Sequence, residues 1–192
     1  MKNKRLQETN LEKRKIELLE EYKKYECKLF DIIRDEKKKE QYLKNLTESV
    51  QEILNEYFRL LNKTVTLSNI PLLYGLLSIA LEGSIKIYFI SKQFDDFIAI
   101  EPKNRTLGKL MKKISKDVYD GVKECLDYLV FIRNHFVHFP LYYKSFYDDE
   151  DVFFTVIIYF LIKSGVYDYI HPELQKRLEE KTGGKDEKTL GS

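Results

Sequence analysis

Residues 70–90 read IPLLYGLLSIALEGSIKIYFI, an apolar segment that is interrupted by two charges, Glu82 and Lys86. A membrane-spanning helix needs about 20 mostly apolar residues without such charges, so a membrane span is the weaker of two interpretations. We instead predict the buried central helix of a bundle, which begins near Pro71. Glu82 and Lys86 are four residues apart in the favourable order and are expected to form an ion pair on the helix surface.

The sequence around this segment predicts further helices, because it contains only eight glycines and four prolines. Apolar residues recur at helical spacing in four other segments. The expected helices cover residues 48–61 (with Asn45 and Glu48 as a capping box), 107–115 (with Thr106 as its cap), 117–131 and 152–162, and a last short helix runs from Pro172 to the Gly183–Gly184 pair. The predicted fold class is all-α, a helical bundle.

The segment 152–162, VFFTVIIYFLI, also suits a buried strand, because it is rich in aromatic and β-branched residues. Its flanks favour a helix. Four acidic residues, 148–151, precede it, Lys163 follows it, and Gly165 can end it.

Domain organisation follows from the distribution of charge. Residues 1–46 are the most polar part, with Lys/Glu runs and apolar residues at helical spacing such as Ile16, Leu19 and Tyr22. We predict a long charged amphipathic helix there, which packs on the body or on another subunit. Residues 47–183 are expected to form the bundle, and residues 184–192 a flexible tail.

Composition excludes several classes of protein. Among 192 residues, 33 Lys and Arg balance 31 Asp and Glu, and the net charge of +2 excludes a histone-like polycation. Nucleic-acid binding must therefore rest on local patches. Two cysteines, Cys27 and Cys125, are too few for a disulfide framework or a structural zinc site. The charged start has no apolar signal-peptide region, so the expected location is the cytoplasm.

The candidate chemistry gathers in residues 132–140, IRNHFVHFP, which hold two of the three histidines. If this phrase is helical, Asn134 and His138 share a face, and His135 and His138 are neighbours. Arg133 lies five residues before His138, ~140° round an ideal helix. Either the helix begins with a turn at this point, or a second subunit completes the site.

Two other interpretations of this phrase stay open. His135 and His138 can both be metal ligands, although the phrase contains no Asp, Glu or Cys and Arg133 would repel a cation. Alternatively, the histidines are half-buried core residues, and Arg133 pairs with an acid such as Asp127.

The pattern Arg133-Asn134-x3-His138 resembles the signature of the HEPN superfamily (higher eukaryote and prokaryote nucleotide-binding domains), an Arg followed by four to six residues and then His. The family typically has a polar residue, often Asn, after the Arg. The segment Thr106-Leu-Gly-Lys-Leu-Met111 looks like one often met upstream of the motif. The resemblance covers roughly residues 48–165.

It implies an all-α bundle with the motif near the start of a late helix, after an apolar helix such as 117–131. One position departs from the family. Toxins controlled by a nucleotidyltransferase partner commonly have a modified Tyr two residues after the motif His, where this chain has Pro140. That form of regulation is therefore not expected here.

The resemblance also implies a metal-independent endoribonuclease that cleaves single-stranded RNA as a homodimer, without a cofactor. The 2′-OH of RNA is its own nucleophile, and His138 can act as general base or acid. Arg133 can neutralise charge on the phosphorane, Asn134 can donate a hydrogen bond, and His135 is a further candidate donor or base. By family habit, the biological role is a toxin or an antiviral or abortive-infection effector, with a cognate regulatory protein or nucleotide as a partner.

Two other functions remain open. One is a catalytically inert HEPN-like module that binds a nucleotide or a partner protein. The other is a helical scaffold whose N-terminal helix is the working part.

A basic segment provides a candidate RNA contact. Residues 103–116 contain six basic residues and no acidic one. Within the expected helix, four lysines fall on one side, which suits a phosphate track: Lys109, Lys112, Lys113 and Lys116. The alternative is an ordinary solvated helix face.

Overall fold

The computed structural model describes residues 13–14, 16–17, 20, 35–63, 70–100, 105–138 and 146–182, apart from the side chains of 133–138 and 146–149. All regular secondary structure in these ranges is helical, which confirms the all-α class. The elements are α2 (Glu36–Leu61), α3 (Ile70–Lys92), α4 (Phe94–Ala99), α5 (Leu107–Met111), α6 (Lys116–Asp120), α7 (Lys123–His138), α8 (Phe146–Ser164), the 3-10 helix η3 (Tyr167–Tyr169) and α9 (Pro172–Lys181). The predicted tail, residues 184–192, lies outside the described residues.

The chain divides into two compact units, residues 1–42 and 43–192. In the first unit, residues 13–14, 16–17 and 20 are helical, and Arg14 forms an exposed ion pair with Glu17. A long charged helix was predicted for residues 1–46, and the other residues of 1–34 lie outside the described residues.

The start of α2 corrects a prediction. The carboxylate of Asp35 accepts hydrogen bonds from the backbone N–H groups of Lys37 and Lys38, at 3.1 and 3.3 Å. Asp35 is therefore the N-cap, and Asn45 lies inside the helix instead of capping a helix that starts near Glu48. The residues between Asp35 and Asn45 are mostly good helix formers, so the helix that begins after Asp35 continues through Asn45.

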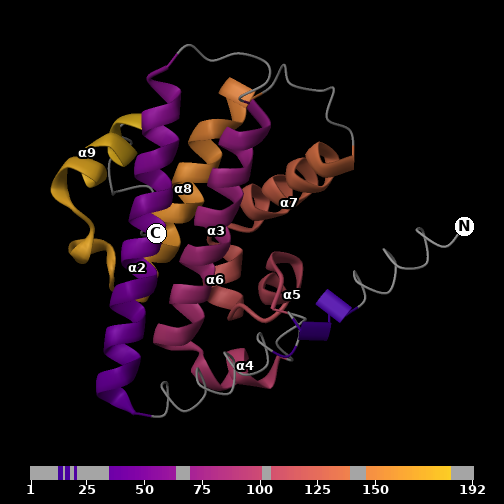
Figure 1. Cartoon of the computed structure of the whole chain (residues 1–192), viewed down its shortest axis with the longest axis vertical. Helices are drawn as coiled ribbons and strands as arrows, with labels where there is room; N and C mark the ends of the chain where they lie inside the picture. Colours follow the sequence, from indigo (N-terminus) through magenta and orange to yellow (C-terminus); the bar gives the residue numbers. More distant parts are fainter. Residues whose placement is uncertain are drawn as a thin grey trace, which may run out of the picture. The chain divides into compact units, whose positions relative to one another are not determined.

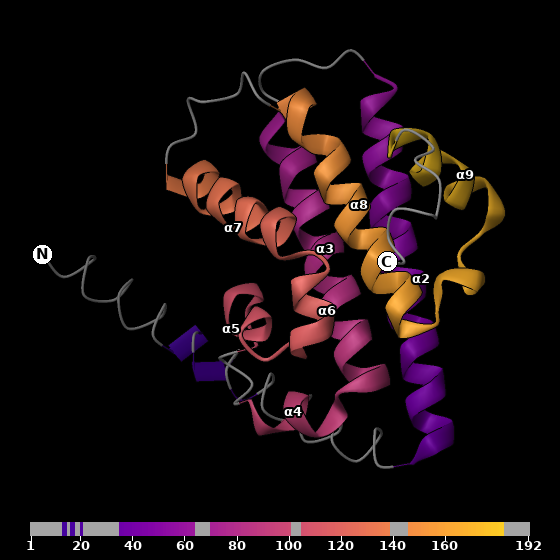
Figure 2. The same cartoon turned by 180° about the vertical axis from the view of Figure 1, so that it is seen from behind.

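The centre of the second unit is the contact between α3 and α8, the most extensive between any two described elements. The two helices run side by side (Figures 1 and 2). Helices α2 and α9 lie on the α8 side of this pair, and α7 lies on the opposite side, next to α3. Twelve residues of α3 are buried, which confirms the predicted central helix. In the described part of the chain, α3 has the length and hydropathy of a membrane span, and half of that stretch is buried inside the bundle. The expected ion pair between Glu82 and Lys86 is present at 2.8 Å.

Aromatic side chains of α8 fill the space between its neighbours. Phe154 stacks on Phe58 of α2 with 5.5 Å between ring centroids, and Phe153 meets Tyr74 of α3 edge-on at 5.7 Å. Such ring pairs are worth about 0.5–1.5 kcal/mol each beyond the area they bury. The segment 152–162, VFFTVIIYFLI, lies within α8, which confirms that it is helical. As a helix it presents aromatic side chains to both α2 and α3.

A buried carboxylate connects three helices. Glu150 of α8 is 6% exposed, and it accepts hydrogen bonds from the Tyr57 hydroxyl of α2 and from Lys181 Nζ of α9, the latter at 3.1 Å. A buried charge without partners would cost several kcal/mol, so these two donors are what make its position tolerable. The contact holds α2 and α9 against the start of α8.

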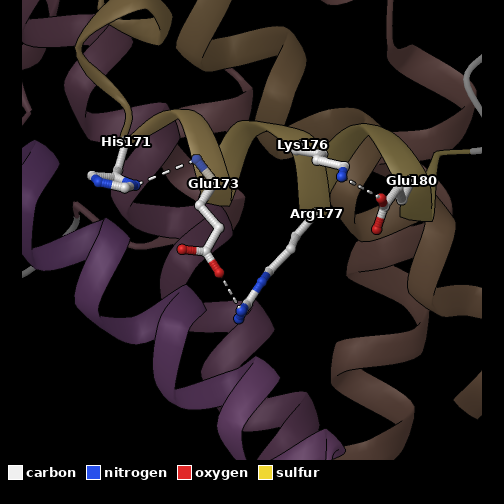
Figure 3. Close-up of polar contacts among 5 residues, drawn as sticks. All are labelled: His171, Glu173, Lys176, Arg177 and Glu180. Carbon is white, nitrogen blue, oxygen red and sulfur yellow. Dashed lines mark hydrogen bonds and ion pairs between the residues drawn. The ribbon is translucent and has the colours of Figure 1, made fainter.

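The last helix begins where it was predicted to begin. Pro172 is the first residue of α9, and Nδ1 of His171 accepts from the backbone N–H of Glu173 at 3.3 Å, so His171 is the N-cap (Figure 3). Glu173 in turn pairs with Arg177 at 2.7 Å, four residues later (Figure 3). The helix ends at Lys181, and the expected stop at Gly183–Gly184 lies outside the described residues.

Two short predicted helices have different bounds in the structure. The helix after Thr106 ends at Met111 instead of continuing to residue 115. The helix predicted for 117–131 is broken at Gly121, which separates α6 from α7. A Cβ at Gly121 would lie 2.5 Å from the hydroxyl oxygen of Tyr159, which donates to the Val118 carbonyl at 3.1 Å. The break therefore depends on a tertiary contact with α8.

Gly165 ends α8, as predicted. Its φ of +78° is in the left-handed region, its N–H donates to the Ile162 carbonyl at 2.9 Å, and the N–H of Val166 donates to the Leu161 carbonyl at 3.2 Å. These two bonds form a Schellman cap, which favours glycine at this position.

We predict that Gly165→Ala lowers the free energy of unfolding by about 1 kcal/mol, because a Cβ is strained at positive φ. Gly75→Ala in α3 is the matched control. Nothing lies within 4 Å of a Cβ at Gly75, so this change should raise stability by about 0.5–1 kcal/mol. Urea unfolding of the two variants measures the change in the free energy of unfolding for each. A Gly165→Ala variant that is more stable than the original chain would contradict the cap.

Candidate nucleic-acid interface

A cleft of about 760 Å³ lies between α5, the turn after it, α6 and α7. Lys109, Lys112 and Lys116 line it from α5, the turn and the start of α6. Tyr119 of α6 and Asp127 of α7 line it as well. The basic segment identified in the sequence therefore borders a concave surface next to the helix that carries the candidate motif.

The turn at residues 112–115 is held in place by Gln93, which lies between α3 and α4. Its side-chain amide donates to the Lys113 carbonyl at 3.3 Å, and its amide oxygen accepts from the Ser115 N–H at 3.0 Å. The Tyr88 hydroxyl of α3 also hydrogen-bonds Ser115 Oγ at 3.0 Å. Ile114 is buried, so the turn is anchored by both polar and apolar contacts. These contacts hold in place the backbone of the turn that carries the exposed lysines.

Arg105 does not belong to the exposed basic segment. It is 7% exposed, its guanidinium lies over the ring of Phe97 at 4.6 Å from the centroid, and its Nε donates to the Ile100 carbonyl at 3.1 Å. A guanidinium can stack on an aromatic face because it is planar and weakly hydrated. Its role here is to fix the chain just before α5. Lys103 lies outside the described residues.

The lysines are not arranged as predicted. A single helical side is wrong, because α5 ends at Met111 and the chain turns before α6. The turn brings Lys109, Lys112 and Lys116 to the same cleft, whereas Lys113 is exposed but is not among the residues that line it. The charged side chains that line the cleft are three lysines and one carboxylate, Asp127, so the cleft has a local excess of positive charge although the whole chain has a net charge of only +2.

The sequence did not predict Tyr119 or Asp127 as binding residues, and Asp127 was considered only as a possible partner of Arg133. The Tyr119 hydroxyl donates to Asp127 Oδ1 at 2.8 Å. This hydrogen bond, with help from partial burial and the negative charge of Asp127, raises the pKa of Tyr119 above its ordinary value of 10.0. The two residues are eight positions apart and on opposite sides of the break at Gly121, so no helical periodicity relates them.

The motif residues lie at the C-terminal end of α7. Arg133, Asn134, His135 and His138 all belong to one continuous helix, so the alternative of a turn at Arg133 is wrong. The expectation that the motif is near the start of a late helix is also wrong, because α7 begins ten residues before Arg133. Their side chains lie outside the described residues, and the possible pairing of Arg133 with Asp127 stays a prediction.

The register of α7 relates the motif to the cleft. Positions 134 and 138 follow Asp127 by seven and eleven residues, spacings that return to the same face of an α-helix. Arg133 lies ~140° from His138 on the same helix. Figures 1 and 2 show that α7 diverges from α3 and α8 towards this end.

Among the residues that the structure describes, no group of three or more His, Cys, Asp or Glu side chains is placed to hold a metal ion.

Comparisons with known proteins add no assignment. The chain matches no protein-family model, no curated protein and no solved structure at a significant level.

We predict that Asp127→Asn lowers the pKa of Tyr119 towards its ordinary value, because this change removes the negative carboxylate that accepts the hydrogen bond of the phenol. A raised pKa in the folded chain means that this pair contributes stability below about pH 10, and that the contribution is lost as the pH rises through the folded pKa. The measurement is an NMR titration of ¹³C-labelled tyrosine.

Tyr167 is the internal control. Its pKa is also raised, by burial first and then by a hydrogen bond to Glu179, and it should not change in the Asp127→Asn variant. An unchanged Tyr119 titration would contradict the pair.

Proposed function

We propose that this chain is a metal-independent endoribonuclease of the HEPN type, which cleaves single-stranded RNA as a homodimer and acts as a toxin or an antiviral effector. The observation that carries the proposal is the register of α7. One helix contributes Asp127 to a lysine-lined cleft and, on the same face, continues to Asn134 and His138. The lysines of α5, the turn after it and α6, which offer a path for a phosphate backbone, thus lie across the cleft from the helix that carries the candidate acid–base group.

The chemistry needs only what these residues supply. RNA provides the nucleophile, its 2′-OH, so no catalytic Ser, Cys or metal-bound water is required. His138 supplies an imidazole, a group that can take or give a proton in the neutral pH range, and such general acid–base catalysis typically accelerates a reaction by ~10²–10⁴-fold. Arg133 can stabilise the charge that grows on the phosphorane oxygens, and Asn134 or His135 can donate a hydrogen bond to the substrate.

The cleft supports an RNA partner on electrostatic grounds. Lys109, Lys112 and Lys116 are exposed, and each phosphate that they contact would release counterions from the strand. This kind of binding is independent of base sequence and weakens as salt is added.

We infer a homodimer from the positions of Arg133 and His138 on α7. The two positions lie ~140° apart round one continuous helix and do not share a face, whereas a two-fold axis can bring one copy's Arg133 to the other's His138. We predict a dimer at micromolar concentration, measured by light scattering. A fully active monomer would contradict this arrangement.

We predict that His138→Ala and Arg133→Ala each lower the single-turnover cleavage rate by ~10²-fold or more, with little change in melting temperature. The matched control is His171→Asn. His171 caps α9, and asparagine also caps helices well, so this variant should keep both its stability and its activity. Motif variants that unfold the chain but keep their specific activity would support the core-residue interpretation.

We predict that cleavage survives excess EDTA and leaves a 2′,3′-cyclic phosphate with a free 5′-OH. An oligonucleotide with a 2′-deoxy sugar at the cut position should bind equally well yet stay whole, because its nucleophile is missing. The rate should rise and then fall around neutral pH, as expected for histidine acid–base catalysis.

Loss of activity in EDTA, or equal cleavage of the 2′-deoxy substrate, would overturn the mechanism. If no RNA is cut, the chain is better described as an inert binding module.

A further inference from the structure

Asp127 stands out among the residues that line the cleft. The three lysines can neutralise phosphates, but a carboxylate repels them, so a cleft built only for a nucleic-acid backbone gains nothing from Asp127. The residue is also held in a defined way. Tyr119 Oη donates to its Oδ1 at 2.8 Å from another helix. A positioned acceptor inside a cationic cleft is typical of a site that reads hydrogen-bond donors on a ligand.

We propose that Asp127 forms a guanine-recognition subsite in this cleft, with Tyr119 as the positioning residue and with Lys109, Lys112 and Lys116 contacting the phosphates. This inference rests on the proposed function where the guanine belongs to an RNA strand. The shared chemistry is a guanine base with an adjoining phosphate, which a free guanine nucleotide also has.

Base chemistry selects guanine. An ionised carboxylate only accepts hydrogen bonds, and its two oxygens suit two parallel donors. The Watson–Crick edge of guanine has two adjacent donors, N1–H and the N2 amino group. Adenine and cytosine each have one amino donor beside an acceptor nitrogen, which a carboxylate repels. Uracil has one N–H between two carbonyl groups and is the poorest match.

Tyr119 makes this recognition specific. Its hydroxyl occupies one lone pair of Oδ1 and fixes the rotation of the carboxylate, while no other side chain that the structure describes donates to Oδ2 or to the other lone pair of Oδ1. The phenol keeps its proton at neutral pH, because its ordinary pKa of 10.0 is already well above neutrality and the hydrogen bond to Asp127 raises that pKa further. A fixed acceptor loses less rotamer entropy on binding than a freely rotating one.

The test measures equilibrium dissociation constants for RNA 9-mers. Every nucleoside in them is uridine except the central one, which is guanosine, inosine, adenosine or uridine. All chains are full length and carry His138→Ala, so that the RNA stays whole. We expect the guanine oligonucleotide to bind about 10-fold more tightly than the adenine or uracil one, the size of one bidentate contact. Inosine lacks the N2 amino group and should lie between them.

The variants separate the residues' roles. Asp127→Asn should abolish the preference for guanine, because its side chain presents one donor and one acceptor, and should bind the adenine oligonucleotide at least as well. Glu124→Gln removes the same charge from α7 outside the cleft and should keep the preference. Tyr119→Phe should lower the preference for guanine over adenine several-fold without affecting the melting temperature. Charge reversal of the three lysines should weaken binding of all four oligonucleotides and leave their ratios unchanged.

Failure of the subsite differs from failure of the proposed function. RNA binding that depends on salt and on the lysines, but shows no base preference, would overturn the guanine subsite and leave the ribonuclease proposal standing. If no RNA binds, guanosine monophosphate is titrated. Binding that requires Asp127 would support the subsite for a free nucleotide and count against the ribonuclease. Binding of neither probe would overturn both.

Discussion

The packing of α3 on α8 is the constraint on which the rest of this structure depends. Both helices are rich in apolar side chains, and they make the most extensive contact between any two described elements, which removes apolar surface of both from solvent. Their shared surface also determines where the other elements attach. α2 stacks Phe58 on the outer side of α8, and α9 reaches the same helix through Lys181 and the buried Glu150. A change that separates α3 from α8 would therefore affect every described helix of the unit.

The candidate interface lies at the margin of this core and uses it as a support. Gln93 follows directly after α3 and hydrogen-bonds the turn at 112–115, so the lysines beside that turn are tied to the central helix. On the facing side, α7 begins packed through Leu126 and Leu129 and then diverges from the bundle towards the motif. The lysines beside the anchored turn and the residues of α7 that face them line the cleft. Because the chain is almost neutral overall, this local geometry concentrates positive charge where composition alone would not.

Sequence reasoning succeeded where one local signal was strong and its neighbours agreed with it. The apolar segment 70–90 predicted α3, Gly165 predicted the end of α8, and Pro172 predicted the start of α9. It failed where two signals competed. Asn45 resembles a cap, but Asp35 already caps a helix whose residues give no reason to stop. Gly121 fits a helical pattern, yet the chain breaks there, where the Tyr159 hydroxyl of α8 donates to the Val118 carbonyl and the Val122 N–H donates to the Tyr119 carbonyl.

The sequence by itself determined the helical class, the central apolar helix, and the presence of Arg133, Asn134 and His138 at helical spacing, because these follow from the order of side chains along one segment. Only the tertiary structure decided which basic residues share a surface. Arg105 is buried on Phe97, Lys113 does not line the cleft, and Lys109, Lys112 and Lys116 meet because the chain turns after Met111. The pairing of Tyr119 with Asp127 likewise depends on the angle between two helices, which contacts with α8 determine and no local pattern encodes.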